Sequence, residues 1–216
     1  AYGQELSNVF VKAKVFDLQT YKIKTFSKKN CDFSYRSSCF KKHPSKFFII
    51  IVALALNKNK KPVLNYLDLQ KFFQNKKNFD LKDVRKAVLK IRKSKGMTIS
   101  SGLKSAGSFF TNPIISKSEF SKLKSKIKTN KTNWFWPSED KVKVSAAFLI
   151  EEAGFNRGYQ KGQAAISPYH SLCLINLNKA KAQEIVDLAF EIQKKVFQKF
   201  KVKIKPEVEL IGFEKY

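Results

Sequence analysis

A serine in an unusual setting is the strongest candidate for chemistry in this chain. The segment SAGSFFTNP (105–113) places Ser108 directly after a glycine and before two aromatic residues and an Asn-Pro pair. Glycine permits the tight backbone turn that would present a hydroxyl, and loops shaped in this way often carry function. The alternative is a plain turn that buries Phe109 and Phe110 in the core.

Other motifs with a known chemistry are missing from the sequence. It contains no G-x-G-x-x-G, no phosphate-binding G-x-x-x-x-G-K-[ST] and no nucleophile elbow. Cys31, Cys39 and Cys173 lack C-x-x-C spacing, so neither a disulfide framework nor a zinc site is indicated, and a reducing cytosol fits. His43 and His170 lie far apart in sequence, and we expect no metal site.

Positive charge is the most conspicuous feature of the composition. Lys and Arg total 43 against 17 Asp and Glu, a formal net charge of +26, which raises nucleic acid and anionic membranes as partners. Almost all of this charge is lysine, whereas proteins that read phosphate and guanine favour the guanidinium group. The arginines are Arg36, Arg85, Arg92 and Arg157. We interpret the charge as a lysine-rich surface, with no nucleic-acid or membrane partner, and keep a basic nucleic-acid-binding protein as an alternative.

The first half of the chain predicts an antiparallel sheet followed by a helix. Apolar and polar residues alternate in 8–16 and 21–26, and 17–20 can turn, so we expect a β-hairpin. The apolar run 47–56 is too short to cross a membrane and predicts a buried, central strand. A helix should follow from Asp80, which can serve as its N-cap.

The second half mixes helices and strands, so the whole chain is predicted to be of the α+β class. A Ser-x-x-Glu capping box at 116–119 should begin one helix, and Ser145 can cap a second that stops at Gly154. We place the border between domains near Gly96. Further elements are expected at 171–176 (strand), 178–199 (long helix with a wide apolar stripe) and 202–211 (final strand).

Six separated strings resemble the UDP-N-acetylenolpyruvoylglucosamine reductase family, in the family's order. They cover nearly the whole chain: AYGQEL (1–6), CDFSYRSSCFK (31–41), PVLNYLDL (62–69), SAGSFFTNP (105–113), AAFLIEEAGF (146–155) and PEVELIG (206–212). The gapped pattern of glycines, Ser167 and His170 also fits. The resemblance begins partway through the family's length. We therefore expect a fragment without the family's N-terminal flavin-cradling portion, and no secretory signal is visible.

The resemblance implies a flavoenzyme of peptidoglycan synthesis in the bacterial cytoplasm. With FAD and NADPH as cofactors, it would reduce UDP-N-acetylglucosamine enolpyruvate to UDP-N-acetylmuramate, and we expect a monomer. Residues 1–95 would be the C-terminal part of an FAD-binding domain with an antiparallel sheet, and 96–199 a smaller α+β domain for the UDP-sugar substrate. Residues 200–216 would return as a strand that carries a catalytic glutamate.

The resemblance also assigns roles to single residues. Ser108 matches the serine that donates a proton to C2 of the substrate, Arg36 the arginine over the substrate carboxylate, and Glu207 the glutamate that assists. Physical chemistry agrees, because a guanidinium can pair with a carboxylate through two hydrogen bonds as negative charge develops. The implied substrate-binding residues are Tyr66, Lys95, Asn112 and His170, and the implied cofactor-binding residues are Tyr2, Gly3 and Tyr35.

The sequence departs from the family pattern beside two of these positions. Where the family reads Y-R-D-S, Ser37 follows Arg36 here, which removes an acid next to the arginine. Where it reads F-F-K-N, the lysine is replaced by Thr111. The loop between Lys95 and Ser108 is slightly longer than in the family. Neither departure touches the three catalytic positions. Because the resemblance lacks the family's N-terminal portion, a catalytically incomplete fragment stays open as a further alternative.

Overall fold

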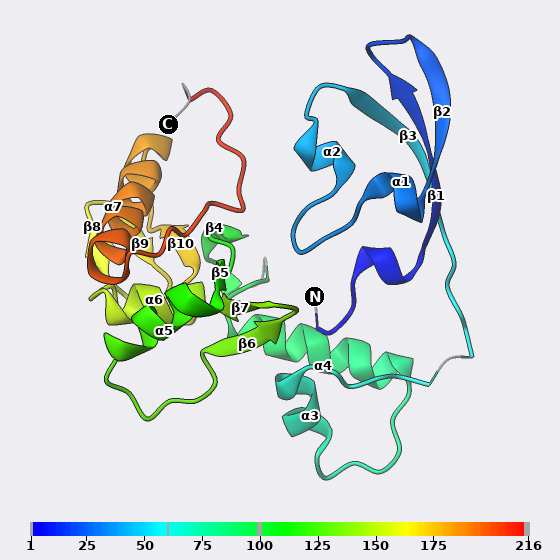
Figure 1. The fold of residues 1–216 in the computed structure, drawn as a ribbon. Helices are drawn as coiled ribbons and strands as arrows, with labels where there is room; N and C mark the ends of the chain where they lie inside the picture. The colour runs from blue at the N-terminus through cyan, green and yellow to red at the C-terminus, as the bar shows by residue number, and fades with distance from the viewer. Residues whose placement is uncertain (1, 60, 99–100, 214–216) are drawn as a thin grey trace. The chain divides into compact units, whose positions relative to one another are not determined.

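The structure, a computed structural model, describes residues 2–59, 61–98 and 101–213. The chain divides into two compact units, Ala1–Lys90 and Ile91–Tyr216 (Figure 1). Both units combine helices with antiparallel sheets, which confirms the predicted α+β class.

The first unit is built on a three-stranded antiparallel sheet in the order β2-β1-β3. The predicted hairpin is confirmed, because β1 and β2 pair in register from Lys12 opposite Ser27 to Asp17 opposite Lys22. The unit's elements are a 3-10 turn Leu6–Asn8, β1 Phe10–Asp17, β2 Lys22–Ser27, α1 Lys28–Cys31, α2 Cys39–Lys42, β3 Phe47–Leu54 and α3 Leu67–Phe73. Its small core contains Phe10, Ala13, Val15 and Cys31, ringed by Phe26, Phe33, Phe40 and Phe47.

The turn of the hairpin is held by Asp17, a buried carboxylate at the end of β1. Its Oδ1 accepts hydrogen bonds from the backbone N–H groups of Gln19 and Thr20 at 2.9 and 3.1 Å. Lys24 in β2 donates to Oδ2 at 2.6 Å. The bond from Lys24 is the main reason why the pKa of Asp17 lies below its ordinary value, although burial opposes the shift.

The prediction of a buried central strand at 47–56 is wrong. β1 is the central strand, and β3 lies at an edge of the sheet. The exposed fractions of Phe48, Ile51 and Leu54 are 64%, 55% and 44%. An apolar run indicates burial because its exposure to water is costly, but burial requires a second layer over the strand. In the part of the chain that the structure describes, most of this strand stays exposed.

The helix predicted from Asp80 is α4, Leu81–Ser94. Oδ1 of Asp80 accepts a hydrogen bond from the N–H of Asp83 at 2.8 Å, and the carboxylate of Asp83 accepts one from the N–H of Asp80 at 3.2 Å. These reciprocal bonds satisfy donors that the first helical turn leaves without intrahelical partners. The predicted N-cap is therefore confirmed.

The second unit holds two antiparallel sheets, ordered β4-β10-β9-β8 and β5-β7-β6. Helix α7 packs on α6, β9 and β10, and buries Leu188, Ile192 and Val196. The predicted apolar stripe is therefore confirmed, although the helix begins later, at Ala182. The elements are β4 Lys104–Ser108, β5 Ile114–Ser116, α5 Lys117–Ser125, β6 Phe135–Ser138, β7 Lys141–Val144, α6 Ala146–Glu152, β8 Gln160–Lys161, β9 Ala164–Ile166, β10 Cys173–Asn176 and α7 Ala182–Phe200.

Short-range signals in this unit predicted its helix starts well. Ser116 and Glu119 form the expected capping box at the start of α5. The hydroxyl of Ser145 accepts a hydrogen bond from the N–H of Phe148 at 3.2 Å and caps α6. The strand expected at 171–176 is β10.

Pairings over longer distances were predicted less well. The β6–β7 hairpin was not foreseen, and residues 104–108, expected to be a loop and turn, form strand β4. The segment 202–211 was expected to be a strand. Its backbone instead forms one isolated bridge, between Pro206 and Phe110.

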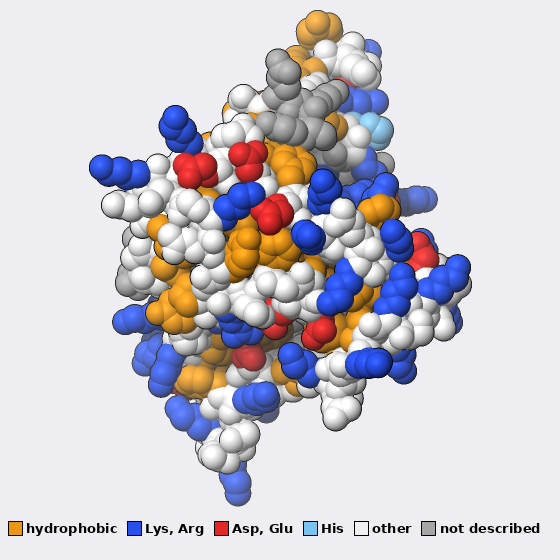
Figure 2. Space-filling model, turned by 90° about the vertical axis from the view of Figure 1, so that its left-hand side faces the viewer, with side chains coloured by type: hydrophobic (Ala, Val, Ile, Leu, Met, Phe, Trp, Pro, Cys, Tyr) orange, Lys and Arg blue, Asp and Glu red, His pale blue; other side chains and the backbone are white. Residues whose placement is uncertain are grey.

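Lysine and arginine side chains are scattered over the face that Figure 2 shows, among apolar and uncharged ones. This distribution agrees with a lysine-rich surface more than with one compact basic patch on that face. Among the described residues, no helix is long and apolar enough to cross a membrane.

Candidate active site

Ser108 is the last residue of β4 and lies opposite Cys173 in β10. The preceding Gly107 has a φ of +85°, a value that residues with side chains rarely adopt. The strand pairing is also irregular just beyond this point, between Cys173 and Ile175. The half-buried serine is thus held at a strand end, and not in the turn that the glycine predicted.

The backbone of the residue after Ser108 is bonded on both sides. The N–H of Phe109 donates to the carbonyl of Leu172 at 2.7 Å, and the carbonyl of Phe109 accepts from the N–H of Glu207 at 2.7 Å. Both aromatic residues that follow Ser108 are buried, so the bonded segments rest on the core. The structure therefore brings the backbones of two residues with predicted catalytic roles, Ser108 and Glu207, into neighbouring segments.

Asn112 supports the start of α6. Its Oδ1 accepts a hydrogen bond from the N–H of Ala146 at 3.0 Å, next to the cap that Ser145 provides. Because this oxygen bonds the helix, the NH₂ group is the part of the Asn112 side chain that can donate to a ligand. A donor is the polarity that a phosphate oxygen requires.

A close approach of the backbone brings Lys95 into the neighbourhood of His170. Gly96 has a φ of +66°, and a Cβ built on it would lie 2.6 Å from Leu103 Cδ1 and 2.9 Å from the ring of Tyr169. A side chain here would have to displace both neighbours and would strain the backbone, so glycine suits this packing. The charge of Lys95 acts on the imidazole of His170, so two residues with predicted substrate contacts share one region.

His170 is a half-buried, neutral imidazole. Its Nδ1 accepts a hydrogen bond from the N–H of Leu172 at 3.1 Å, which leaves Nε2 to carry the proton. Burial, followed by the positive charges of Lys95 and Arg157, lowers the pKa of His170, while Glu151 opposes them. A lowered pKa keeps the ring uncharged at neutral pH.

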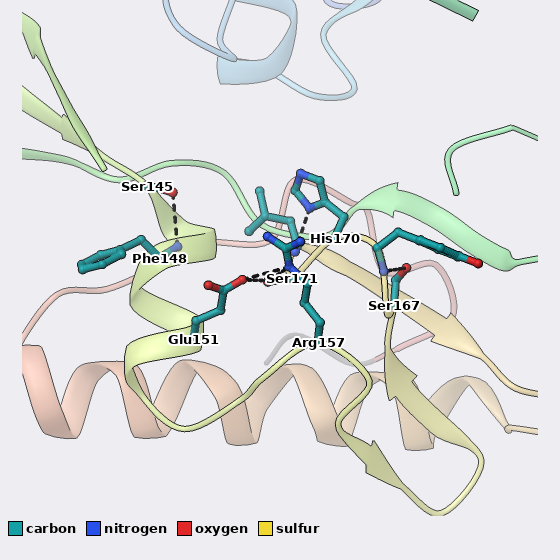
Figure 3. Close-up of polar contacts among 9 residues, drawn as sticks. Ser145, Phe148, Glu151, Arg157, Ser167, His170 and Ser171 are labelled. Carbon is teal, nitrogen blue, oxygen red and sulfur yellow. Dashed lines mark hydrogen bonds and ion pairs between the residues drawn. The ribbon is translucent and has the colours of Figure 1, made fainter. Parts of the chain in front are cut away.

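An ion pair that the sequence did not indicate lies beside His170 (Figure 3). Nε of Arg157 donates to Oε1 of Glu151 at 3.2 Å and to Oγ of Ser171 at 3.4 Å, and the hydroxyl of Ser171 donates to Glu151. Ser171 is buried, whereas Arg157 is exposed. Arginine is rare in this lysine-rich chain, and this rarity is the signal that could have pointed to Arg157 in the sequence.

A pocket of about 460 Å³ lies next to this ion pair. Trp134 and Phe148 stack in its wall, with ring centroids 4.7 Å apart. None of the ten residues assigned from the resemblance lines it. The lining residues are Asn130, Lys131, Thr132, Asn133, Trp134, Ser145, Ala147, Phe148, Glu151 and Arg157. The second unit therefore has a pocket with polar lining residues and an aromatic wall, and Arg157, whose charge acts on His170, is one of its lining residues.

In the first unit, the turn at residues 2–3 lies against Tyr66. The rings of Tyr2 and Tyr66 meet edge to face, with centroids 5.0 Å apart. Gly3 has a φ of +79°, and a Cβ there would lie 2.8 Å from the Cβ of Asn65. The structure thus brings together Tyr2 and Gly3, which were assigned to the cofactor, and Tyr66, which was assigned to the substrate.

Tyr35 and Arg36 form the tip of a two-residue turn in the first unit. Ser34 and Ser37 exchange backbone hydrogen bonds of 3.1 and 3.0 Å across it. The guanidinium carbon of Arg36 lies 5.5 Å from the centroid of the Tyr35 ring, a cation–π contact. Arg36 has a φ of +54°, and non-glycine residues in that region are enriched at functional sites.

The fold and these residues define an α+β protein in which a serine and a glutamate occupy neighbouring segments and cations gather nearby. Among the described residues, no group of three or more His, Cys, Asp and Glu could hold a metal ion.

Residues 98–211, more than half of the chain, match the C-terminal domain of UDP-N-acetylenolpyruvoylglucosamine reductase. The chain belongs to this family.

Curated relatives extend the similarity over nearly the whole chain. The UDP-N-acetylenolpyruvoylglucosamine reductase of Flavobacterium johnsoniae is 38% identical over 215 residues, which are 98% of this chain and 63% of the relative. The reductase of Pasteurella multocida is 37% identical over 212 residues, which are 98% of this chain and 60% of the relative. The chain thus spans about 60% of the length of these relatives.

A solved structure supports the fold. The reductase of Thermus caldophilus superposes with a TM-score of 0.55 at 20% sequence identity, over 94% of this chain and 53% of that protein. At this identity the comparison supports the fold alone.

Proposed function

We propose that this chain supplies the catalytic serine, arginine and glutamate of a UDP-N-acetylmuramate dehydrogenase. The reaction would be the reduction of UDP-N-acetylglucosamine enolpyruvate with NADPH and FAD, in cytoplasmic peptidoglycan synthesis. The observation that carries the proposal is the hydrogen bond from the N–H of Glu207 to the carbonyl of Phe109, because it fixes Glu207 beside the residue that follows Ser108. Membership of the reductase family supports the same reaction.

The residues assigned to the cofactor would contribute to one wall of a flavin site. Gly3 is exposed on one side and packed against Asn65 on the other, so its peptide groups permit close approach of a flat ring. Tyr2 adds an aromatic ring at the same turn, and Tyr35 would approach from its own turn beside Arg36. When bound, FAD would supply to substrate C3 the hydride that it receives from NADPH. We assign residues 1–95 to the FAD-binding domain.

Three side chains would then complete the reduction of the enolpyruvyl group. Arg36 would pair with the substrate carboxylate through two parallel hydrogen bonds, and stabilise the negative charge that develops there. Ser108 would give its proton to C2. Glu207 would assist Ser108. A hydroxyl is a weak acid in water, so proton donation depends on such charged neighbours and on a site closed to bulk solvent.

The nucleotide part of the substrate would bind the second unit, within a domain of residues 96–199. Lys95 and the NH₂ group of Asn112 would donate to the diphosphate, and Arg157 adds a cation in the same region. A neutral His170 can donate from Nε2 without adding charge. We propose Tyr66 as a further substrate-binding residue. We further propose that the complete reductase acts as a monomer.

Nucleotide binding can be measured on the 216-residue chain itself. In titration calorimetry with UDP-N-acetylglucosamine, Lys95→Ala should weaken binding about tenfold, because one charge-assisted hydrogen bond contributes about 1.5–3 kcal/mol. Lys122→Ala removes an exposed lysine of α5 and should leave the affinity unchanged. Equal affinities for the two variants would reject the role of Lys95.

Proton donation can be measured in a complete reductase, made by joining this chain to the N-terminal portion of the Flavobacterium johnsoniae relative. Ser108→Ala should leave the reduction of the flavin by NADPH unchanged, since no substrate carbon gains a proton in that half-reaction. Reoxidation by the enolpyruvyl substrate should slow by about 10²–10⁴, the usual range for general acid catalysis. Stopped-flow absorbance separates the two halves. Ser121→Ala, an exposed serine of α5, is the control, and undiminished reoxidation in Ser108→Ala would refute the assignment.

A further inference from the structure

Cys31 and Cys39 lie at the two ends of the loop that carries Tyr35 and Arg36. Cys31 is the last residue of α1 and Cys39 the first residue of α2, and these two short helices pack against each other. The cysteines are 0% and 9% exposed. The two thiols lie close enough to influence each other's pKa.

Polar contacts also join the two ends of this loop, and backbone turns shape the loop itself. Asp32, which follows Cys31, forms an ion pair with Lys42 at the end of α2. Asp32 and Arg36 adopt φ values of +45° and +54°, which turn the chain back on itself. The loop is therefore already closed at its base while both thiols are reduced.

We propose that Cys31 and Cys39 are a redox pair that forms a reversible disulfide and locks the Arg36 loop. A disulfide requires two backbone segments at short distance, and the packing of α1 against α2 provides them. With a diazene such as diamide, both S–H bonds break and one S–S bond forms. The two protons and two electrons that the thiols release convert the N=N bond of the oxidant into the two N–H groups of a hydrazine.

Burial makes this pair slow to react while the helices are closed. It raises the pKa of Cys31 to about 11, and burial and the charge of Asp32 also raise the pKa of Cys39. The thiolate is the reactive form, so both thiols react slowly while they are buried. One-turn helices open at low cost, which gives a small oxidant access.

The disulfide itself does not depend on the proposed function, whereas its effect on turnover does. If Arg36 binds the substrate carboxylate, a covalent lock on its loop would change turnover in the joined reductase, and dithiothreitol would reverse the change. Mapping of the disulfide needs neither substrate nor flavin, so failure of one proposal can be told from failure of the other.

The test treats the folded 216-residue chain with diamide, then denatures it, alkylates the remaining thiols and digests it with trypsin without reductant. We expect peptides 30–36 and 37–41 to be joined, and Cys173, which lies in the second unit, to be alkylated. Dithiothreitol should separate the pair. Cys173→Ser should keep the link and Cys39→Ser should abolish it. Full alkylation of both peptides in the wild type, or their joining to Cys173 instead, would overturn the proposal.

Discussion

Asp17 shows how one buried carboxylate can determine a turn. An asparagine there would keep an oxygen for the N–H groups of Gln19 and Thr20, but would lose the ion pair with Lys24. We expect Asp17→Asn to lower the melting temperature by a few degrees at neutral pH. The folded-state pKa is depressed, so this stabilisation is complete above the ordinary aspartate pKa of about 4 and is lost as the pH falls toward the folded value.

Thermal unfolding from about pH 7 down to about pH 2 tests this expectation. The difference in melting temperature between the wild type and Asp17→Asn should narrow below about pH 4. Asp140→Asn, at an exposed position between β6 and β7, serves as the control and should change little. A gap that stays constant at every pH would show that the charge of Asp17 does not stabilise the fold.

The residues of the candidate site were predictable to different degrees. Ser108 and Glu207 stood in strings that resemble the family, and their neighbouring backbones agree with a shared site. The strand end that holds Ser108 was not foreseen, because the flanking glycine indicated a turn. The link of Arg157 and Glu151 to Ser171 depends on how α6 packs against the segment before β10, which no local pattern encodes.

Gly96 joins two elements at a contact that tolerates no side chain. Alanine there would place its Cβ 2.6 Å from Leu103 and 2.9 Å from Tyr169, at a φ of +66°. We expect Gly96→Ala to lower the free energy of unfolding by about 2–4 kcal/mol, as backbone strain adds to overpacking. Gly102→Ala is the matched control, because its φ is +72° but nothing lies within 4 Å of its added Cβ. It should lose only about 1–2 kcal/mol. Chemical denaturation that gives equal losses would rule out the close approach.

Strand β3 exposes apolar side chains along the edge of its sheet. Such an edge favours pairing with other chains, so we expect the 216-residue chain to bind a hydrophobic dye and to self-associate. The double variant Ile49→Lys and Ile51→Lys should reduce both effects without unfolding the chain, because these residues are 43% and 55% exposed. Val15→Lys, in the buried face of β1, should unfold the unit. Dye fluorescence and light scattering measure the difference, and unchanged self-association in the double variant would contradict this role of β3.

At the level of elements, the sequence predicted those whose causes are local. Alternation gave the first hairpin, and capping residues gave the starts of α4, α5 and α6. The failures have non-local causes. Whether β3 is buried depends on what covers it, and the segment around Pro206 forms a bridge instead of a strand because of its partner near Phe110.

For the whole molecule, the net charge of +26 sets the long-range field. This field attracts polyanions of any sequence, and salt weakens the attraction over a Debye length of about 8–10 Å. A dedicated nucleic-acid site would concentrate the affinity in a few side chains. A dispersed lysine surface would spread it over many, and the two cases can be separated by experiment.

We expect weak, sequence-independent binding to duplex DNA that falls steeply between about 50 and 200 mM salt as counterions are released. Lys12→Gln with Lys14→Gln removes two exposed charges from β1, and Lys122→Gln with Lys124→Gln removes two from α5. Both double variants should weaken binding slightly and to a similar extent, since neither pair belongs to a defined site. Fluorescence anisotropy with two unrelated duplexes measures this. If one double variant abolished binding while the other left it intact, the charge would form a specific interface, and the basic nucleic-acid-binding alternative would be favoured.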